Sequence, residues 1–222
     1  MWQLHQFPLC PFSRKVRLLL GEKGVAYGLV RENPWEQKDE FIHLNPASRT
    51  PVMTDDRGMT LVDSVAICEY IDETVDKNSM ISGSAGYRAE IRRLVAWFDQ
   101  QFYGDVTAPL LHERMTKRLV QRQPPDAKVL REAMRLANNH LDYVDYLIDN
   151  RAWLAGSTMS MADLAAAAQI SVADYLGGID WSGHEQTKAW YAMFKSRPSF
   201  RPLLSERMES IAPPKHYELV DF

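Results

Sequence analysis

The pattern of apolar residues changes near residue 80, and this change limits the possible folds more than any other feature of the sequence. Before it, short apolar segments that fit strands alternate with patterns that fit helices. The order is strand, helix, strand, connector, hairpin and helix, which predicts a small mixed sheet with helices packed on it. The connector at 35–44 fits a short helix and loop, and Gly24 is placed to end the first helix. The expected strands are 2–7, 27–32, 51–54 and 60–62, and the expected helices are 12–23 and 64–75.

Beyond residue 86 the apolar spacing predicts helices only. One apolar stripe runs from Ile91 to Phe102, and a second runs from Leu130 to Ile148 behind a capping Asp126. Residues 78–86 (NSMISGSAG) have no sustained period and predict a linker. Further helices are expected at 160–176, 185–195 and 199–208. We therefore expect an α/β domain at 1–77, a linker at 78–86, an all-helical domain at 87–210 and a C-terminal tail at 211–222.

Charge and cysteine usage indicate a reduced, cytoplasmic protein. The net charge is −3, which argues against a general nucleic-acid binder. Cys10 and Cys68 are the two cysteines, too few for a disulfide framework. The N-terminus has no apolar core of signal-peptide length, and no apolar run is long enough to span a bilayer. The six histidines show no metal-ligand spacing, so no metal is expected; they are His5, His43, His112, His140, His184 and His216.

The segment FPLCPFSRKVR places Cys10 between a predicted strand and a predicted helix. A sulfur at a helix N-terminus lies near unpaired N–H groups and the positive end of the helix dipole, and both favour the thiolate. Arg14 and Lys15 could add to this effect. Cys10 is therefore a candidate nucleophile, and the alternative of a small packing residue has about equal weight. Ser13, the hydroxyl of this C-x-x-S pattern, could donate to the sulfur, but its expected place is the exposed helix surface.

Two polar turns in the first domain are candidate binding elements. Thr50-Pro51 stands at the entrance of a strand, where a cis bond would turn the backbone toward a ligand, although trans is the commoner form. Asp63-Ser64 opens a helix, and a serine hydroxyl beside free N–H groups suits a carboxylate. The alternative for Ser64 is a plain N-cap, which we favour without other context.

The chain resembles the glutathione-transferase superfamily over essentially its whole length. The resemblance implies a thioredoxin-like α/β first domain, an all-α second domain and a homodimer. It implies glutathione as a ligand, with Thr50 and a cis Pro51 at its cysteinyl part and Asp63 and Ser64 at its γ-glutamyl end. Cys10 falls at the catalytic position, where Cys-Pro-Phe members tend toward thiol transfer. The motifs are 8–17 (PLCPFSRKVR), 45–52, 61–71 and 153–163, the last with Ser160 and Asp163 as a capping-box variant.

A second resemblance is to the alphaproteobacterial cell-division proteins of this fold that bind the tubulin-like protein FtsZ (the FzlA type). It implies that the fold serves as a binding scaffold rather than chiefly as an enzyme. That family usually carries Ser-Pro-Phe-Cys, whereas this chain has Cys10-Pro11-Phe12-Ser13. The matching stretches are 7–17, 34–37, 67–71, 93–99, 190–191, 195–198 and the tail from 213 to 222.

The candidate partner-binding residues lie near the C-terminus and in the connector. The tail ends in Asp221 and Phe222, which suit peptide-style docking, although a tail that covers its own domain is as well supported. A basic face on the final helix, with Leu203 as its apolar partner, would suit an acidic filament, but such a face is usually just solvated. We expect removal of 215–222 to weaken filament binding and leave the fold intact. The residues assigned here are Trp35, Arg197, Arg201, Arg207, Asp221 and Phe222.

Three functions remain open from the sequence. The first is an FtsZ-binding division scaffold with little or no transferase activity. The second is a glutathione-dependent thiol transferase that uses Cys10. The third is a conjugating glutathione S-transferase in which Cys10 or Ser13 only assists bound glutathione. Tyr103 and His112 are weak candidates for the wall of a pocket for electrophiles, and no phosphate loop or G-x-S-x-G motif is present.

Overall fold

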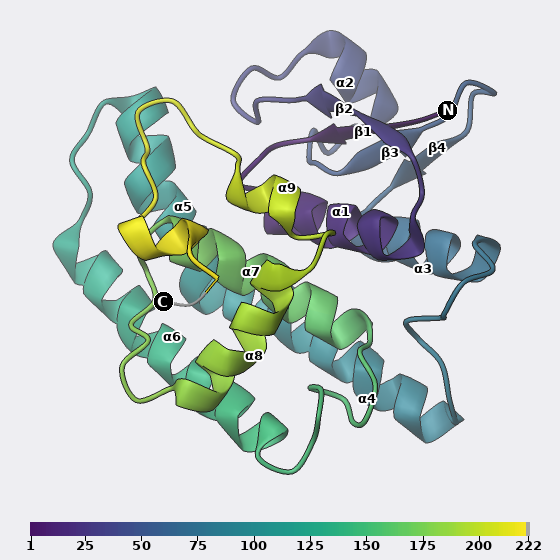
Figure 1. Cartoon of the computed structure of the whole chain (residues 1–222). Helices are drawn as coiled ribbons and strands as arrows, with labels where there is room; N and C mark the ends of the chain where they lie inside the picture. Colours follow the sequence, from purple (N-terminus) through teal and green to yellow (C-terminus); the bar gives the residue numbers. More distant parts are fainter. Residues whose placement is uncertain (221–222) are drawn as a thin grey trace.

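Four short strands form the mixed sheet that the first part of the sequence predicts (Figure 1). The computed structural model describes residues 1–220. β1 pairs with β2 in parallel, and β3 lies antiparallel to both β1 and β4, which gives the order β2-β1-β3-β4. The parallel pair requires a crossover connection, and the first helix supplies it. The strands are β1 (Trp2–Gln6), β2 (Tyr27–Arg31), β3 (Val52–Thr54) and β4 (Thr60–Val62).

Three helices accompany the sheet: α1 (Pro11–Lys23), α2 (Asp39–Leu44) and α3 (Ser64–Thr74). α1 begins with proline in its first turn, where a missing N–H leaves no bond unmade. It ends at Gly24, whose φ of 69° allows its N–H to reach the last carbonyls, as the sequence predicts. In Figure 1, α1 and α3 lie between the sheet and the remaining helices, and α2 lies on the other side of the sheet.

The second part of the chain is helical, as predicted, and begins at Ala85. One continuous helical stretch runs from there to Gln121 and contains two π-helical segments, η1 and η2, in which N–H groups bond five residues back. Among residues 1–220, no helix combines the length and apolar character that crossing a bilayer requires. The elements are α4 (Ala85–Ala96), η1 (Trp97–Thr107), α5 (Ala108–Leu111), η2 (His112–Gln121), α6 (Ala127–Ile148), α7 (Met161–Tyr175), α8 (Glu185–Ser196), α9 (Arg201–Leu204) and the 3-10 turn η3 (Lys215–Glu218).

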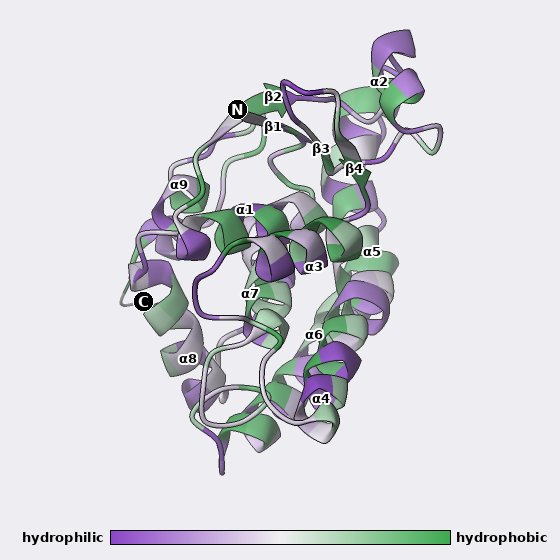
Figure 2. Ribbon diagram, turned by 90° about the vertical axis from the view of Figure 1, so that its right-hand side faces the viewer, coloured by the Kyte–Doolittle hydropathy of each residue, from purple (hydrophilic) through white to green (hydrophobic). Residues whose placement is uncertain are grey.

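Helix α7 is the centre of the core. All of its residues are buried, and it packs against α1, α4 and η1 (Figure 2). A helix that is buried on all sides needs neighbours on all sides, and the first domain supplies one of them through α1. The α/β part and the helical part therefore share one continuous hydrophobic core.

The N-terminus of α7 is built around a buried carboxylate. Asp163 is fully buried, and its oxygens accept hydrogen bonds from the N–H of Leu154 at 2.9 Å and the N–H of Ser160 at 2.9 Å. The Ser160 hydroxyl (3.0 Å) and the Trp190 indole N–H (3.3 Å) complete the set. The capping box that the sequence predicts is confirmed, and it also joins the 153–160 loop and α8 to α7.

The expected helix at 199–208 is wrong, because α9 covers only Arg201–Leu204. The chain then turns, and an antiparallel bridge joins Met208 to Ile211 before η3. The turn between α8 and α9 approaches α1 so closely that a Cβ at Gly21 would lie 2.8 Å from the Cβ of Ser199. Glycine is therefore required in this turn of α1.

An ion pair joins the turn between α8 and α9 to α1. Arg197 donates two hydrogen bonds of 2.7 Å to the two carboxylate oxygens of Glu22, and the Ser199 hydroxyl donates a third. Burial alone would raise the pKa of Glu22, but the bonds from Arg197 and Ser199 outweigh it, so this pKa lies below its ordinary value. The charged carboxylate therefore stabilises the contact between the two parts of the chain.

Glu22→Gln is expected to lower the free energy of unfolding by about 1–2 kcal/mol at pH 7, because it weakens this bidentate contact. A lowered pKa in the folded state gives stability that is present above the unfolded-state pKa and lost as pH falls through the folded-state value. The difference between wild type and variant should therefore shrink below about pH 4.5. Urea denaturation between pH 7 and pH 3 measures it.

Glu132→Gln is the matched control, because Glu132 also binds an arginine, Arg135, but both side chains are exposed. Exposed pairs contribute about 0–1 kcal/mol, so this change should have a smaller effect that depends little on pH. Equal effects of the two substitutions would contradict the inference that the Glu22–Arg197 pair stabilises the contact between the two parts of the chain.

Candidate functional site

A two-lobed cleft lies between the loops of the α/β part and the helical segments η1 and η2. One lobe has a volume of about 400 Å³ and is bounded by 45–51, by 62–65 and by η1. The other has a volume of about 620 Å³ and lies between the start of α1 and η2. The lobes share Phe12, Arg49, Thr50 and Asp99, so they form one continuous hollow. This cleft brings together most of the residues that the sequence singles out for chemistry.

Cys10 lies in the larger lobe, at the boundary between loop and helix. It is the N-cap of α1, and its side chain is partly buried. Its Sγ donates to the Thr50 carbonyl oxygen at 3.5 Å, and the peptide bond between Thr50 and Pro51 is cis. The structure therefore places Cys10 beside the cis Thr50-Pro51 turn, and the roles of these residues toward a ligand stay predictions.

The two basic residues that follow Cys10 in the sequence are engaged elsewhere. Arg14 is fully buried, and its guanidinium donates to the Pro8 carbonyl oxygen and to the hydroxyls of Ser171 and Tyr217. Lys15 is also buried and forms an ion pair with Asp99. The expectation that these two cations act on the sulfur has no geometric support, because both are engaged in contacts inside the protein.

Ser13 is not at the helix surface, and this expectation is also wrong. Its side chain is fully buried, and its Oγ has no hydrogen-bond partner among residues 1–220. It is absent from the lining of both lobes. A catalytic role for Ser13, as donor to a sulfur in the cleft, therefore has no geometric support.

Asp63 and Ser64 line the smaller lobe. Asp63 is the N-cap of α3, and its carboxylate accepts the N–H of Val65 at 2.7 Å and that of Ala66 at 3.4 Å. It has a φ of 78°, unusual for a residue other than glycine. The favoured interpretation of Ser64 as the cap is wrong by one residue. Ser64 is the first residue of α3 and is buried at the lobe wall.

Arg49 is a site residue that the sequence interpretation missed. Its exposed side chain lines both lobes, and its backbone carbonyl accepts a 2.8 Å hydrogen bond from Asn45. Residue 49 stands in the motif around Pro51, but only the fold shows that it borders both lobes. Its cation, with Ser64 and the start of α3, suits a ligand that carries carboxylates, so the residues present fit glutathione.

Tyr103 and His112 both line the larger lobe, as the sequence suggests for them. Tyr103 packs on Phe12 with ring centroids 4.8 Å apart. Burial, with a smaller effect of nearby Cys10, raises the pKa of Tyr103 above its ordinary value. Tyr103 therefore stays a neutral phenol over the Cys10 side of the cleft.

The predicted partner-binding arginines differ in the contacts that the fold gives them. Arg197 is the residue that ends α8, and its guanidinium is held by Glu22. Arg207 forms an ion pair with Glu218, whereas Arg201 is exposed. The proposed apolar partner Leu203 is fully buried, so it does not give this face an exposed apolar centre.

Trp35 is more than one-third exposed at 37%, and it packs edge-on against Phe7 with ring centroids 5.6 Å apart. It remains available as a surface aromatic beside the cleft. Asp221 and Phe222 lie outside the described residues.

The segment before them, in contrast, is anchored in the core. Tyr217 is fully buried, and the His216 ring lies 2.8 Å from a carboxylate oxygen of buried Asp174. Lys195 donates to the His216 carbonyl oxygen at 3.2 Å. The structure therefore argues against the expectation that 215–222 can be removed without loss of the fold.

One cluster of described residues has the geometry for a cation: Asp142, Asp145 and His184 place ligand atoms within 4.8 Å of one another. Asp145 already accepts bonds of 2.7 Å from both the N–H and the hydroxyl of Thr187. These bonds give the carboxylate a structural role at the start of α8. The spacing of 142, 145 and 184 in the sequence does not suggest the cluster, because α6 and α8 come together only in the fold.

Comparison with known proteins finds glutathione S-transferase relatives for both parts of the chain. The sequence profile of the glutathione S-transferase N-terminal domain matches residues 9–74, and that of the C-terminal domain matches residues 107–198. FtsZ-localized protein A of Caulobacter vibrioides is 43% identical over 99% of this chain and 97% of its own length.

Two solved structures superpose on the whole chain. One is a glutathione S-transferase from Rhodospirillum rubrum, with a TM-score of 0.97, 44% identity and full coverage of both chains. The other is FzlA from C. crescentus, with a TM-score of 0.97, 42% identity and coverage of 100% of this chain and 99% of the other. The similarity includes the tail as well as both parts of the fold.

Proposed function

The chain belongs to the glutathione S-transferase family, and from this premise we propose that it acts as a cytoplasmic cell-division scaffold that binds FtsZ filaments, with little or no transferase activity. The observation that carries the proposal is the full-length similarity to FtsZ-localized protein A, a protein named for its localisation with FtsZ. The family resemblance also supports a homodimer as the working unit.

The cleft supports the scaffold over the enzyme. Arg14 and Lys15, the cations next to Cys10 in sequence, are both committed to buried contacts. The Cys10 thiol donates to the Thr50 carbonyl oxygen at 3.5 Å. An efficient thiol-transfer enzyme places cations or free N–H donors beside its sulfur, because the thiolate is the nucleophile.

The proposed filament-binding residues are those that the fold leaves available. Trp35 presents a partly exposed aromatic ring, and Arg201 presents an exposed cation. Aromatic side chains and arginine are the residue types that contribute most to interfaces. Arg201 lies at the start of α9, close in sequence to the tail.

Cosedimentation with FtsZ polymerised with GTP tests the proposal. The wild-type chain should pellet with filaments, and the double substitution Trp35→Ala with Arg201→Ala should weaken binding about tenfold or more. Arg135→Ala is the matched control, because it removes an exposed arginine from α6. Absence of the wild-type chain from the pellet would overturn the proposal.

Cys10 carries a second candidate function, glutathione-dependent thiol transfer, because it faces the cis Thr50-Pro51 turn in an open cleft. In that reaction the Cys10 thiolate would attack a glutathione mixed disulfide, releasing the other thiol as thiolate. A second glutathione thiolate would then attack the Cys10–glutathione disulfide, regenerating Cys10 and forming oxidised glutathione.

Calorimetric titration with reduced glutathione, together with mass spectrometry after exposure to oxidised glutathione, separates the two functions. The Cys68→Ser variant serves as the control, because burial raises the pKa of Cys68 to about 12 and keeps that thiol inert. Tight binding with an adduct on Cys10 would favour the enzyme. The scaffold predicts neither.

A further inference from the structure

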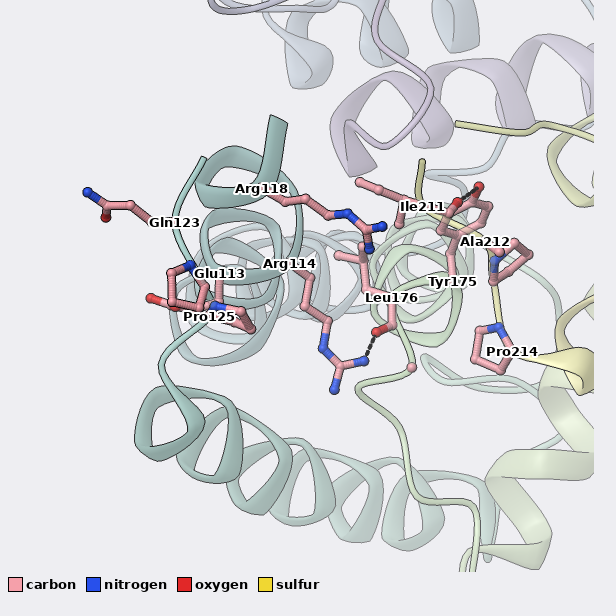
Figure 3. A pocket seen from close by; sticks show the side chains of 13 residues that line it. Glu113, Arg114, Arg118, Gln123, Pro125, Tyr175, Leu176, Ile211, Ala212 and Pro214 are labelled. Atoms are coloured by element: carbon pink, nitrogen blue, oxygen red, sulfur yellow. Dashed lines mark hydrogen bonds between the residues drawn. The ribbon is translucent and has the colours of Figure 1, made fainter. Parts of the chain in front are cut away.

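A second hollow, here called the arginine groove, lies along η2 and has a volume of about 580 Å³ (Figure 3). The residues of η2 that face it differ from those that face the cleft, so the two hollows are separate. The end of α7 forms its floor, the 123–125 turn forms one side, and the 211–214 segment forms the other. The residues used below are Arg114, Arg118, Pro125, Ile211 and Pro214.

Arg114 is a half-buried cation in this groove. It donates one hydrogen bond to the Leu176 carbonyl oxygen at the end of α7, and this contact is drawn in Figure 3. Among residues 1–220 it has no carboxylate within ion-pair distance, and burial lowers its pKa. A partly buried cation has lost some of its hydration, and without a carboxylate partner in the protein it can gain charge-assisted hydrogen bonds from the carboxylate of a ligand.

Arg118 is the second cation, one turn further along η2. Its side chain extends across the groove toward Ile211 in Figure 3. The described part of the chain gives it no hydrogen bond or ion pair. Among residues 1–220, Glu113 is the one carboxylate in the lining, and it is engaged by Lys117 at 2.7 Å and by the N–H of Asp126 at 2.6 Å. The groove therefore carries a net positive charge.

The shape of the groove fits an extended chain. Its walls are apolar at Pro125, Ile211 and Pro214, with the buried Tyr175 below. A neighbouring hollow of about 510 Å³ shares Arg118, Ile211 and Ala212 with it, so the surface continues toward Arg207. Side chains on one face of an extended peptide recur every two residues, roughly 6–7 Å apart. Residues four apart on a helix have a similar separation of roughly 5–6 Å, so Arg114 and Arg118 can meet alternate acidic residues.

We propose that the arginine groove binds an extended, acidic peptide segment of a partner protein. Alternate carboxylates pair with Arg114 and Arg118, and the peptide lies between the apolar walls at Pro125 and Pro214. Pro213 and Pro214 have no backbone N–H with which to bind a peptide main chain. Selection of the peptide therefore depends on charge complementarity with the two arginines. This inference goes beyond the proposed function, since it requires neither FtsZ nor the cleft.

Fluorescence anisotropy with a fluorescein-labelled octapeptide of alternating glutamate and valine tests the proposal on the full chain. Wild type should bind this peptide, and binding should weaken as salt rises. The same peptide with glutamine in place of glutamate should bind at least about tenfold more weakly, because the charge-assisted bonds are lost.

Arg118→Gln should also weaken binding about tenfold. This variant should fold normally, since Arg118 is exposed, whereas Arg114 also contacts the end of α7. Ala212→Glu, which places a carboxylate at the exposed rim, should abolish binding by neutralising the groove. Arg135→Gln on α6 is the matched control with the same charge change and should leave binding unaltered.

Three results would overturn the proposal. They are absence of wild-type binding, equal binding of the glutamate and glutamine peptides, and equal affinity of the Arg118→Gln and Arg135→Gln variants for the glutamate peptide. Because no filament is present in this assay, its outcome is independent of the cosedimentation result.

Discussion

Removal of residues 215–222 is expected to lower the free energy of unfolding by about 3–5 kcal/mol, because it takes a fully buried tyrosine out of the core. The Tyr217 ring packs edge-on against Tyr175, with centroids 5.1 Å apart. Its hydroxyl accepts a 3.0 Å hydrogen bond from Arg14 and donates to the Leu203 carbonyl oxygen at 3.4 Å. The truncated protein would have a cavity at the junction of α1, α7 and α9.

The truncation also removes a partner of a buried cation. Arg14 would keep the Pro8 carbonyl oxygen and the Ser171 hydroxyl, each at 2.8 Å, but would lose the tyrosine oxygen. Leaving part of a buried charge unsatisfied adds about 1–3 kcal/mol to the cost of a cavity. Because Pro8 is two residues before Cys10, the loop that carries the thiol should also become less ordered.

Guanidinium denaturation of three chains measures this effect. The chain ending at Pro214 should show the full loss, whereas the chain ending at Glu218 retains Tyr217 and should lose less. Tyr217→Phe keeps the ring and removes only the hydroxyl, so it should cost about 1–3 kcal/mol. Equal stability of the two truncated chains would contradict the assignment of Tyr217 as the anchor. The chain ending at Glu218 is the suitable one for testing whether Asp221 and Phe222 bind filaments.

Asp163→Ala is expected to destabilise the protein by about 3–5 kcal/mol, because four donors share this carboxylate and each donor left buried and unpaired costs about 1–3 kcal/mol. The loss is less than the sum of the four, since a charged group is itself costly to bury. Burial raises the pKa of Asp163 to about 6, so the carboxylate is still charged at pH 7 and can accept all four bonds.

Thermal and chemical denaturation of three variants test this assignment. Ser160→Ala removes one donor and should cost about 1 kcal/mol. Asp76→Ala removes an exposed carboxylate from the loop after α3 and should have an effect within about 0.5 kcal/mol. An Asp163→Ala variant as stable as the Asp76→Ala variant would show that the buried cap does not hold α7 in place.

Much of the fold was predictable because its signals are local. The first helix begins at a proline and ends at Gly24, and both positions follow from backbone chemistry within one turn. Asp126 caps α6, and Ser160 with Asp163 opens α7, as their types and spacing predict. The resemblance to the glutathione-transferase superfamily and to FtsZ-binding division proteins, based on ordered motifs, is confirmed as family membership by the comparisons.

The incorrect sequence-based predictions share one cause: spacing along the chain does not show which distant segments pack on a residue. The apolar residues at 199–208 have helical spacing, but Leu203 and Met208 are buried in different surroundings, one in α9 and one in a turn bridged to Ile211. Burial of both favours the turn over a continuous helix. Arg14 lies four residues after Cys10, but Cys10 is the N-cap with extended backbone, so the neighbour rule for residues four apart within a helix does not bring the two side chains together. In the fold the Arg14 side chain is covered by α7 and the tail.

The sequence by itself determined most of the helices and strands, the two-part organisation and the caps at Gly24, Asp126 and Ser160. Those features depend on contacts within a few residues or on motifs that occur in a fixed order. Only the tertiary structure decided which polar side chains can reach a ligand. It buries Arg14, Lys15 and Ser13 and pairs Arg197 with Glu22. It leaves Arg49, Arg114 and Arg118 in the linings of hollows. Burial and ion pairing depend on which distant segments pack together, and the spacing of residues along one chain does not encode that directly.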